Sequence, residues 1–454
     1  MLDCIIIGAG PAGLAAGRSL VRSGLQIKIL EAEAAPGGRT RSTQRDGMIV
    51  DLGAAFLASF YTRTLALARE AGVRVEPTGV RPGHGGSRQA LLVDGTYRPN
   101  SFGTLSGFLR FPLVPASQKL RFAASLLRSN FKRGLDPADP GTLTATDIED
   151  ARQWALRTFS AEAYEFFVRL AFEPFFLYEA AEASAAFVQS LLSRTRGWHL
   201  LAPRNGMGDL STVLAQGLPI KYGARASIVE SDGCAFHVHH AGAVEHASTV
   251  IVAIPAPATR ALVLPLESAD ETFVRSIRFV PSVRAQLGYG RRGVLYPPVI
   301  APADPGRRPI VGIGALSAWF PQRADPSKDI LQVNASAWRS AELLGQPADQ
   351  VASQLLADCA RLGVHIPAAD WVDVLQEPHA IVHTPPGHFT KTHSFAARDR
   401  NGLYFAGDWL TGSTIEGAVR SGEAAAARAR ETLRGRKAAT SAAQPSSREP
   451  TGRR

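Results

Sequence analysis

A glycine-rich turn near the start of the chain limits the folds that this sequence can adopt. The β-branched run 5–7 is typical of a buried parallel strand, and Gly8, Gly10 and Gly13 follow it. Gly8 permits a tight turn, Gly10 lets a phosphate approach the backbone, and Gly13 lets the next helix pack close to the strand. Residues 11–23 fit that helix. The order of strand, turn and helix predicts a Rossmann-like unit that binds a dinucleotide.

The residues after this turn complete the predicted nucleotide site. Pro11 and Ala12 begin the helix, so its N-terminal amides and its dipole would face the phosphates. Residues 26–30 alternate as a second strand, which delivers Glu31 eighteen residues after Gly13. A carboxylate at this place accepts hydrogen bonds from a ribose diol and favours a nucleotide without a 2′-phosphate. This unit alone does not distinguish NAD from FAD.

A second pair of glycines distinguishes the two dinucleotides. Gly37, Gly38 and Arg39 follow Glu31, and Asp51-Leu52-Gly53 stands further along the chain. This run resembles the flavin amine oxidase superfamily, which includes amine oxidases, protoporphyrinogen oxidases and phytoene-desaturase-like proteins. The resemblance implies that Gly38 and Arg39 lie along the phosphates and the ribityl chain of FAD, with Gly53 also at the cofactor. A Rossmann domain that binds only NAD has no need of these residues.

The resemblance continues in the middle of the chain and at its far end. Residues 248–255 resemble the strand that returns to the FAD-binding domain, and Ala226 falls where the family packs a short strand beside the adenine. Residues 403–405 predict another buried strand. The resemblance implies that Gly407 and Asp408, directly after it, meet the ribityl or pyrophosphate region.

The segment after Asp408 is expected to begin a helix that faces the flavin. Thr414, Ile415 and Glu416 stand at its start. The positive end of such a helix can face the flavin pyrimidine ring and stabilise the negative charge that develops on reduction. The sequence therefore predicts one FAD held between the first and the last segments of the chain.

Markers of ordinary amine oxidation are missing at the expected positions. On the monoamine oxidase pattern, the two tyrosines that flank an amine would fall at Ala380 and Thr414, and the lysine near flavin N5 would fall near Ala285. The cysteine that binds flavin covalently would fall at His379. We therefore expect non-covalent FAD, although a histidyl link through His379 stays open.

Two side chains are weak candidates for a catalytic role. His388 is one of four histidines, with His379, His383 and His393, in a stretch that its prolines and glycine predict to be a loop. It could act as an acid, a base or a hydrogen-bond donor in the pocket, or be a solvated loop residue. Trp409 could lie near the flavin or only pack the start of a helix. The histidine spacing matches no helical ligand pair, so no metal site is expected.

The motifs divide the chain into two interleaved domains. We predict an α/β fold of the flavoprotein type with two dinucleotide-binding domains. Residues 1–76, 203–268 and 394–434 would form the Rossmann-like FAD-binding domain. Residues 77–202 and 269–393 would form an α+β substrate-binding domain, with 77–202 mostly helical. Seven phenylalanines stand between residues 159 and 187, and they either line an apolar cavity or form a plain core.

The net charge of +10 is concentrated at the C-terminus. Residues 434–454 hold six basic residues and one acidic residue, which is half of the excess. Residues 435–454 are rich in Arg, Ala, Ser and Pro and predict a disordered basic tail. The remaining charge suits an anionic cofactor or substrate, and no nucleic-acid partner is expected.

Two further patterns concern the location of the protein. No apolar run approaches the roughly 18 residues of a membrane span, and the apolar N-terminus lacks the basic leader of a signal peptide. The three cysteines are widely separated and show no metal-ligand spacing. We therefore expect a cytoplasmic protein without an integral membrane segment. A peripheral membrane contact stays open, as does the choice between a monomer and a homodimer.

Together these patterns predict an FAD-dependent oxidoreductase. The resemblance implies that it removes hydride from a carbon of a hydrophobic small molecule, as protoporphyrinogen oxidases and desaturases do, with flavin N5 as the hydride acceptor. Dioxygen or another acceptor would reoxidise the flavin. Two alternatives stay open. One is an amine or amino-acid oxidase with an atypical pocket, and the other is a redox-silent FAD-binding isomerase or ligand-binding flavoprotein.

Overall fold

The first sheet of the protein collects strands from three distant parts of the chain. The computed structural model describes residues 1–81, 89–100, 104–194 and 198–443. This sheet has seven strands in the order β10, β2, β1, β13, β12 and β11, and β19 also pairs with β13. Neighbours among β10, β2, β1, β13 and β19 run parallel. The bounds are Leu2–Ile7 (β1), Ile27–Leu30 (β2), Ile220–Lys221 (β10), Ala226–Ser231 (β11), Phe236–His240 (β12), Ala243–Val252 (β13) and Leu403–Phe405 (β19).

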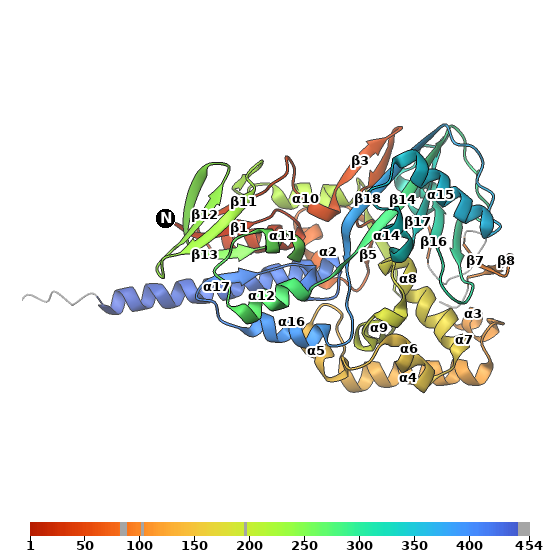
Figure 1. Ribbon diagram of the computed structural model, residues 1–454, viewed down its shortest axis with the longest axis horizontal. Coiled ribbons are helices and arrows are strands. Elements are labelled where there is room, and N and C mark those ends of the chain that lie inside the picture. The colour runs from red at the N-terminus through yellow and green to blue at the C-terminus, as the bar shows by residue number, and fades with distance from the viewer. Residues whose placement is uncertain (82–88, 101–103, 195–197, 444–454) are drawn as a thin grey trace, which may run out of the picture.

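Helices cover both faces of this sheet (Figure 1). On one face α1 and α17 pack closely, because a Cβ atom on Gly422 would lie only 2.1 Å from the carbonyl oxygen of Ala12. Helices α2 and α10 complete this layer, whereas α11, α12 and α16 pack on the other face. This three-layer arrangement is the predicted Rossmann-like α/β fold. The bounds are Pro11–Val21 (α1), Thr62–Glu70 (α2), Met207–Ala215 (α10), Ala256–Ala261 (α11), Ser268–Ser276 (α12), His388–Ala397 (α16) and Ile415–Ala443 (α17).

A second sheet of seven strands has the order β18, β14, β17, β16, β15, β7 and β8. Its bounds are Ala90–Val93 (β7), Thr96–Pro99 (β8), Phe279–Tyr289 (β14), Val299–Pro302 (β15), Ile310–Ala315 (β16), Asp329–Ala335 (β17) and Trp371–Val382 (β18). Helices α14 (Ala337–Leu343) and α15 (Ala348–Arg361) cover one face of it. All seven strands come from the segments assigned to the substrate domain, although the domain boundaries themselves stay a prediction.

Two small sheets lie outside these large ones. Strands β3 (Ser42–Arg45) and β4 (Met48–Asp51) form an antiparallel hairpin. Strands β5, β9 and β6 form a three-stranded antiparallel sheet, with bounds Leu57–Ala58 (β5), Leu200–Pro203 (β9) and Val75–Pro77 (β6). Strand β9 thus brings the chain back from the helical segment to the residues that follow the first glycine turns.

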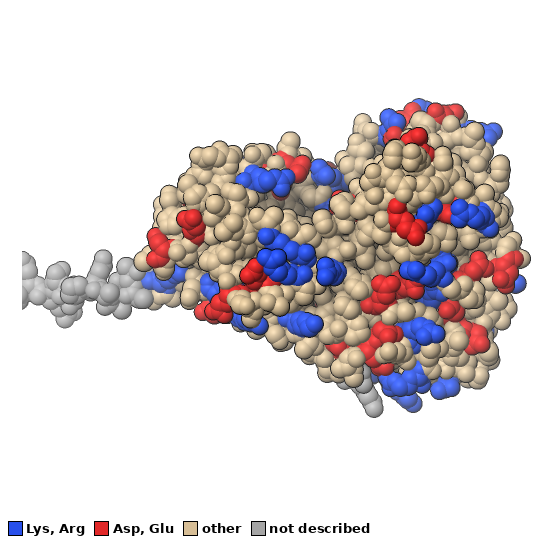
Figure 2. All heavy atoms as spheres, in the orientation of Figure 1, with Lys and Arg blue, Asp and Glu red and all other residues tan. Residues whose placement is uncertain are grey.

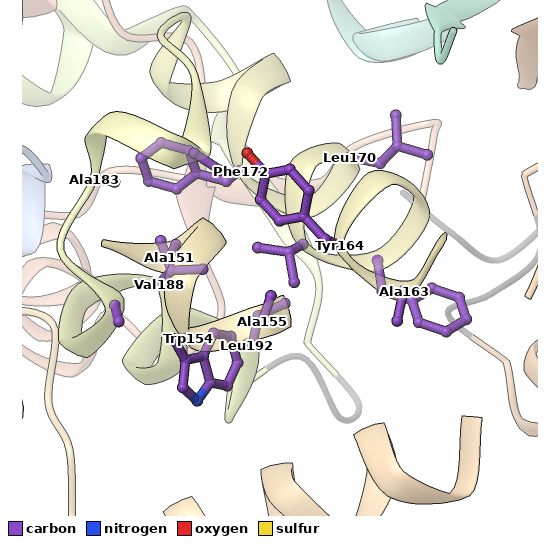
Figure 3. Packing of buried hydrophobic residues seen from close by; sticks show 14 of the residues in the cluster. Ala151, Trp154, Ala155, Ala163, Tyr164, Leu170, Phe172, Ala183, Val188 and Leu192 are labelled. Atoms are coloured by element: carbon purple, nitrogen blue, oxygen red, sulfur yellow. The ribbon is translucent and has the colours of Figure 1, made fainter. Parts of the chain in front are cut away.

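The segment between residues 104 and 192 is largely helical, whereas the rest of the predicted segment 77–202 also contains the strands β7, β8 and β9. Its phenylalanines pack mainly with one another in a buried cluster, part of which Figure 3 shows. A cavity of about 20 Å³ within this cluster is lined by Ala171, Phe172, Val188, Leu191 and Leu192, and it has room for about one water molecule. The plain core is therefore the better interpretation of these rings. The bounds are Leu105–Arg110 (α3), Ala116–Arg133 (α4), Pro140–Leu143 (α5), Ala151–Thr158 (α6), Ala161–Ala163 (α7), Leu170–Phe176 (α8) and Ala185–Leu192 (α9).

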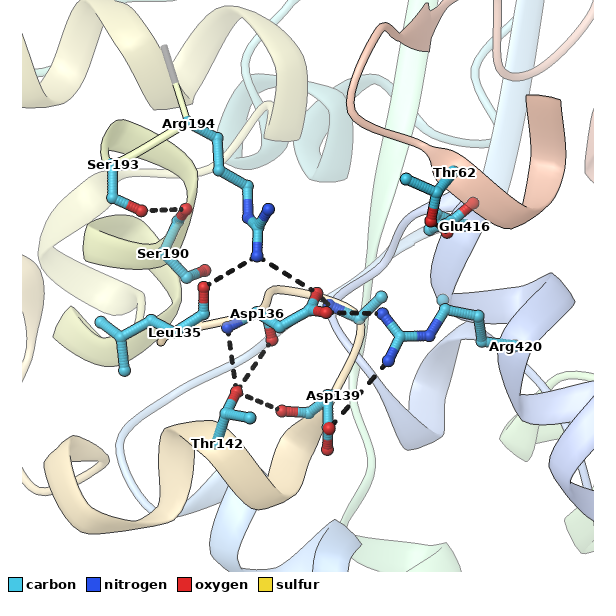
Figure 4. A network of polar contacts seen from close by, with 12 residues as sticks. Thr62, Leu135, Asp136, Asp139, Thr142, Ser190, Ser193, Arg194, Glu416 and Arg420 are labelled. Carbon is cyan, nitrogen blue, oxygen red and sulfur yellow. Dashed lines mark hydrogen bonds and ion pairs between the residues drawn. The ribbon is translucent and has the colours of Figure 1, made fainter. Parts of the chain in front are cut away.

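A polar network joins the helical segment to α17. Arg420 of α17 forms an ion pair with Asp136 at 2.7 Å, and Arg194 donates to the carbonyl oxygen of Leu135 at 3.0 Å (Figure 4). Burial by itself would raise the pKa of Asp136, but the hydrogen bonds from Arg420 and from the backbone of Ala138 lower it overall. The carboxylate therefore stays charged and holds the turn before α5 against α17.

Two expectations about local structure are wrong. Residues 435–443 are helical because α17 continues to Ala443, where alanine, arginine and lysine are strong helix formers. The rest of the predicted tail, 444–454, lies outside the described residues. The four histidines do not share a loop either, since His388 and His393 lie in α16 and His379 lies in β18. The signals from proline and glycine apply only to the short connection between these two elements.

The surface carries charges of both signs. Figure 2 shows Lys and Arg side chains beside Asp and Glu side chains over the face that it presents, and a notch between the two halves of the molecule. Over the described ranges, no helix combines the length and the apolar character needed to cross a bilayer.

Candidate cofactor and substrate site

The three glycines of the first turn have different surroundings. Gly8 has a φ of +102°, and a Cβ atom on it would lie 2.8 Å from the carbonyl oxygen of Ala253. A Cβ atom on Gly13 would lie 2.0 Å from the carbonyl oxygen of Gly8, so helix and strand could not pack as they do. A Cβ atom on Gly10 would meet nothing within 4 Å. Gly10 therefore faces open space at the N-terminus of α1, where Pro11 is the first helical residue.

The second glycine turn borders the same open space. The backbone N–H of Gly37 donates to the carbonyl oxygen of Ala9 at 2.9 Å, which fastens the two turns together. A Cβ atom on Gly38 would meet only the Cα atom of Gly10, at 3.8 Å. Two glycines thus border a strip without side chains, in front of the first amides of a helix. This strip fits the pyrophosphate of a dinucleotide.

Glu31 is buried next to this strip. Its carboxylate accepts hydrogen bonds from the backbone N–H of Ala9 at 2.6 Å and of Glu33 at 2.9 Å. Two backbone donors fix the carboxylate and leave acceptor sites for ribose hydroxyls. The backbone N–H of Ala224 donates to the carbonyl oxygen of Glu31 at 2.8 Å. This bond brings the start of β11, where Ala226 is half-buried, to the same side of the site.

The first and last segments of the chain meet at Arg39. Its Nη2 forms an ion pair with Oδ1 of Asp408 at 2.7 Å, and its Nη1 donates to the carbonyl oxygen of Ala380 at 3.0 Å. Its guanidinium also lies over the ring of Phe279, 5.2 Å from the centroid. A contact between residues 369 positions apart in sequence places both nucleotide motifs at one site. The expected contact of Arg39 with phosphate or ribityl stays a prediction.

Trp409 lies in a buried apolar cluster beside the first sheet. Its side chain is fully buried, and its Nε1 donates to the carbonyl oxygen of Ile254 at 3.1 Å. The rings of Phe273, Phe395 and Phe405 lie around it. This packing fits the alternative that Trp409 packs the start of a helix, and its catalytic role stays a prediction. The preceding Gly407 donates its N–H to Oγ of Ser421 at 2.9 Å and so ties Asp408 to α17.

The start of α17 has a role that the sequence did not reveal. Glu416 is buried, and its carboxylate accepts hydrogen bonds from the backbone N–H groups of Arg63 at 2.9 Å and Thr64 at 2.8 Å. These groups belong to the first turn of α2, so Glu416 caps that helix. Figure 4 shows Glu416 beside Thr62, the first residue of α2. Thr414 and Ile415 are also buried, and Oγ1 of Thr414 accepts from the N–H of Gly417 at 3.0 Å. Within the described residues the carboxylate of Glu416 is thus bound to α2, and the cofactor contacts of Thr414, Ile415 and Glu416 stay predictions.

Arg284 is a site residue that the sequence reasoning missed. Its guanidinium donates to the carbonyl oxygens of Asp51 at 3.0 Å and Gly53 at 3.4 Å, next to the second glycine turn. Burial lowers the pKa of Arg284 to about 10, although the charges of Asp51 and Glu377 oppose the change. The resemblance placed the basic position near Ala285, but Ala285 packs on the opposite face under α14 and α15. The alternation of Val283, Ala285 and Leu287 would have located the arginine.

A buried ion pair lies next to the backbone that Arg284 contacts. Oδ2 of Asp51 binds Nη1 of Arg323 at 2.6 Å, with both side chains almost completely buried. Oδ1 of Asp51 accepts from Oγ of Ser42 and from the N–H of Met207. Arg323 also donates to the carbonyl oxygen of Pro203. The sequence identified Asp51 only as part of a motif and did not identify Arg323.

His388 is buried and is not a solvated loop residue. Burial lowers its pKa to about 4, and the hydrogen bond to the Thr411 backbone opposes this only in part. Among the described residues its Nε2 has no hydrogen-bond partner. The imidazole is therefore neutral at physiological pH, and its catalytic role stays a prediction. Over the same residues no group of three His, Cys, Asp or Glu could hold a metal ion.

Comparisons with known proteins agree with this geometry. The family described as flavin containing amine oxidoreductase matches residues 11–430. Putrescine oxidase of Kocuria rosea is 42% identical over 71 residues, which are 16% of this chain and 15% of that protein. Such curated relatives are matched over only a small part of their own length, as the zebrafish (Danio rerio) flavin-containing amine oxidase is over 14%.

Solved structures match almost the whole fold. A cofactor-binding variant of putrescine oxidase has a TM-score of 0.76 at 17% identity, and the match covers 95% of this chain and 99% of that chain. A protein from Exiguobacterium described as a protoporphyrinogen oxidase has a TM-score of 0.72 at 16% identity, with 95% and 98% covered. At these identities the likeness concerns the fold alone.

Proposed function

The chain belongs to the family of flavin-containing amine oxidoreductases, and from that premise we propose which reaction it catalyses. As a member of this family it is an FAD-dependent oxidoreductase with a small-molecule substrate and an electron acceptor. We propose that it removes hydride from a carbon atom of a largely hydrophobic molecule. The acceptor in this proposal is dioxygen or another oxidant.

One observation carries the proposal, which is the convergence of both ends of the chain on one strip between the two glycine turns. Gly10 and Gly38 border the strip, and the ion pair of Arg39 with Asp408 closes it at 2.7 Å. When bound there, FAD supplies the hydride acceptor, flavin N5, and passes the electron pair to the oxidant. The amides at the start of α1 would hold the pyrophosphate, and Glu31 would hold the adenosine ribose.

The surroundings favour a substrate other than a simple amine. No aromatic ring stands at Ala380 or Thr414, and the carbonyl oxygen of Ala380 is bound by Arg39. Without two facing rings, an amine loses the cation–π contacts that would orient it. Half-buried aromatic rings follow Gly53 instead, and Phe56 packs against Phe320 with centroids 5.3 Å apart. From these rings, which belong to an apolar cluster at β4 and β17, we propose that the substrate has an apolar body.

Anaerobic titration tests the proposal. Purified protein should be yellow, and an oxidisable apolar substrate should bleach the oxidised flavin bands without dioxygen. Peroxide release with simple amines would favour the amine oxidase alternative. Product formed without net electron transfer would favour the redox-silent isomerase. A correctly folded protein that never takes up FAD would contradict all three.

A further inference from the structure

The face of the second sheet that points away from α14 and α15 carries a compact polar group. In the register of β14 with β17, Arg284 stands opposite Asn334 and Gln286 stands opposite Gln332. Nε2 of Gln286 donates to Oε1 of Gln332 at 2.9 Å, and Nε2 of Gln332 donates to Oδ1 of Asn334 at 2.9 Å. We call these four residues the polar face. Their hydrogen bonds order the amides across two central strands.

This face borders a space that protein atoms do not fill. Gln332 and Asn334 keep partial exposure in the middle of the sheet, whereas Leu331 and Val333 on the other face are fully buried. On the next strand, a Cβ atom on Gly312 would meet only Nδ2 of Asn334, at 4.0 Å. The space lies toward the cofactor side, because Arg284 of the same face contacts the carbonyl oxygens of Asp51, at the end of β4, and of Gly53.

Arg284 has no anionic hydrogen-bond partner in the described part of the chain. It is 9% exposed, and its acceptors there are two backbone carbonyl oxygens. The nearby carboxylate of Asp51 is bound to Arg323, and that of Glu377 accepts the N–H of His379. Two of the five N–H donors of a guanidinium are thus used, and three remain. A buried charge without a directly bound counter-ion is costly, although Asp51 and Glu377 lie nearby, so an anionic ligand would complete the site.

We propose that the polar face recognises a carboxylate on the substrate, with Arg284 as the residue that binds it. The substrate class is then an amphipathic acid with an apolar body, and this rests on the function proposed above. A guanidinium matches the two oxygens of a carboxylate, and charge-assisted bonds of this kind are strong. The amides of Gln286, Gln332 and Asn334 orient the group. A cationic amine at the same place would be repelled by Arg284.

The test compares three ligands of nearly equal shape on the FAD-loaded enzyme. Phenylacetate, phenylacetamide and phenethylamine are titrated while the flavin absorption spectrum is recorded. We expect phenylacetate to bind at least about tenfold more tightly than the other two. Arg284→Gln should remove this preference, whereas Arg284→Lys should keep part of it. Arg45→Gln is the matched control, because Arg45 is a more exposed arginine whose ion pair with Asp373 lies at the edge of the same sheet.

Each result decides the question. The proposal would be overturned if the amide or the amine bound most tightly to the unchanged enzyme, or if all three affinities were equal. So would a fully flavin-loaded Arg284→Gln variant that keeps the carboxylate preference. If that variant does not fold, the order of the three affinities in the unchanged enzyme still decides. Failure of the proposed function would look different, since the unchanged enzyme would then lack flavin or would not be reduced by any substrate.

Discussion

Neighbouring glycines of one turn differ in what an added methyl group would meet. A methyl group on Gly13 would collide with the carbonyl oxygen of Gly8, whereas one on Gly10 would enter open space. We therefore expect Gly10→Ala to keep the fold within about 1 kcal/mol and to weaken FAD binding at least about tenfold. Gly13→Ala should lose about 3 kcal/mol of stability or more, because helix and strand must separate. Thermal unfolding of both apoproteins and FAD titration check this, and an unaltered FAD affinity in Gly10→Ala would contradict it.

The buried imidazole of His388 predicts a pH dependence of stability. Its pKa is lowered from 6.5 to about 4, so between these values the unfolded chain binds the additional proton. The free energy of unfolding should therefore decrease as pH falls through this window, by about 2 kcal/mol between pH 7 and pH 5. Urea unfolding of His388→Asn should lack this part of the decrease. Equal decreases in both proteins would argue that the imidazole is protonated in the fold.

At the scale of elements, Glu416 links two helices. Its buried carboxylate accepts two backbone N–H groups of α2, whereas the half-exposed Glu423 forms only an ion pair with Arg63. We expect Glu416→Ala to destabilise the protein by about 2–4 kcal/mol, and Glu423→Ala, the matched control, by less than about 1 kcal/mol. Denaturant unfolding measures both values. Similar losses in the two variants would mean that the cap contributes little.

Among these elements, the sequence could predict those that depend on local spacing but not those that depend on distant contacts. Short spacings predicted β1, α1 and β2, because Gly8, Gly13 and Glu31 act on their own neighbours. Sequence spacing cannot reveal partners that are distant in the chain, such as the backbone N–H groups of α2 that donate to the carboxylate of Glu416. The resemblance placed the basic position near Ala285, one residue from Arg284, and in a strand a shift of one residue reverses the face. Likewise, His388 has a loop-like sequence context, but it lies in a helix that tertiary packing buries.

For the whole molecule, the decisive feature is the closure of one site by two chain segments. Arg39 and Asp408 are partly buried, so either charge alone would remain poorly compensated inside the protein. We expect Arg39→Gln and Asp408→Asn each to weaken FAD binding at least about tenfold, and the double variant to lose less than the sum, with a coupling of about 1–3 kcal/mol. FAD titration of the three variants gives the cycle, and apoprotein unfolding separates binding from stability. Strictly additive losses would mean that the two ends act on the cofactor independently.

The cofactor should also dissociate in intact form when the protein unfolds, because His379 is exposed and we propose non-covalent binding. Flavin that stays on the unfolded chain would reveal a covalent link.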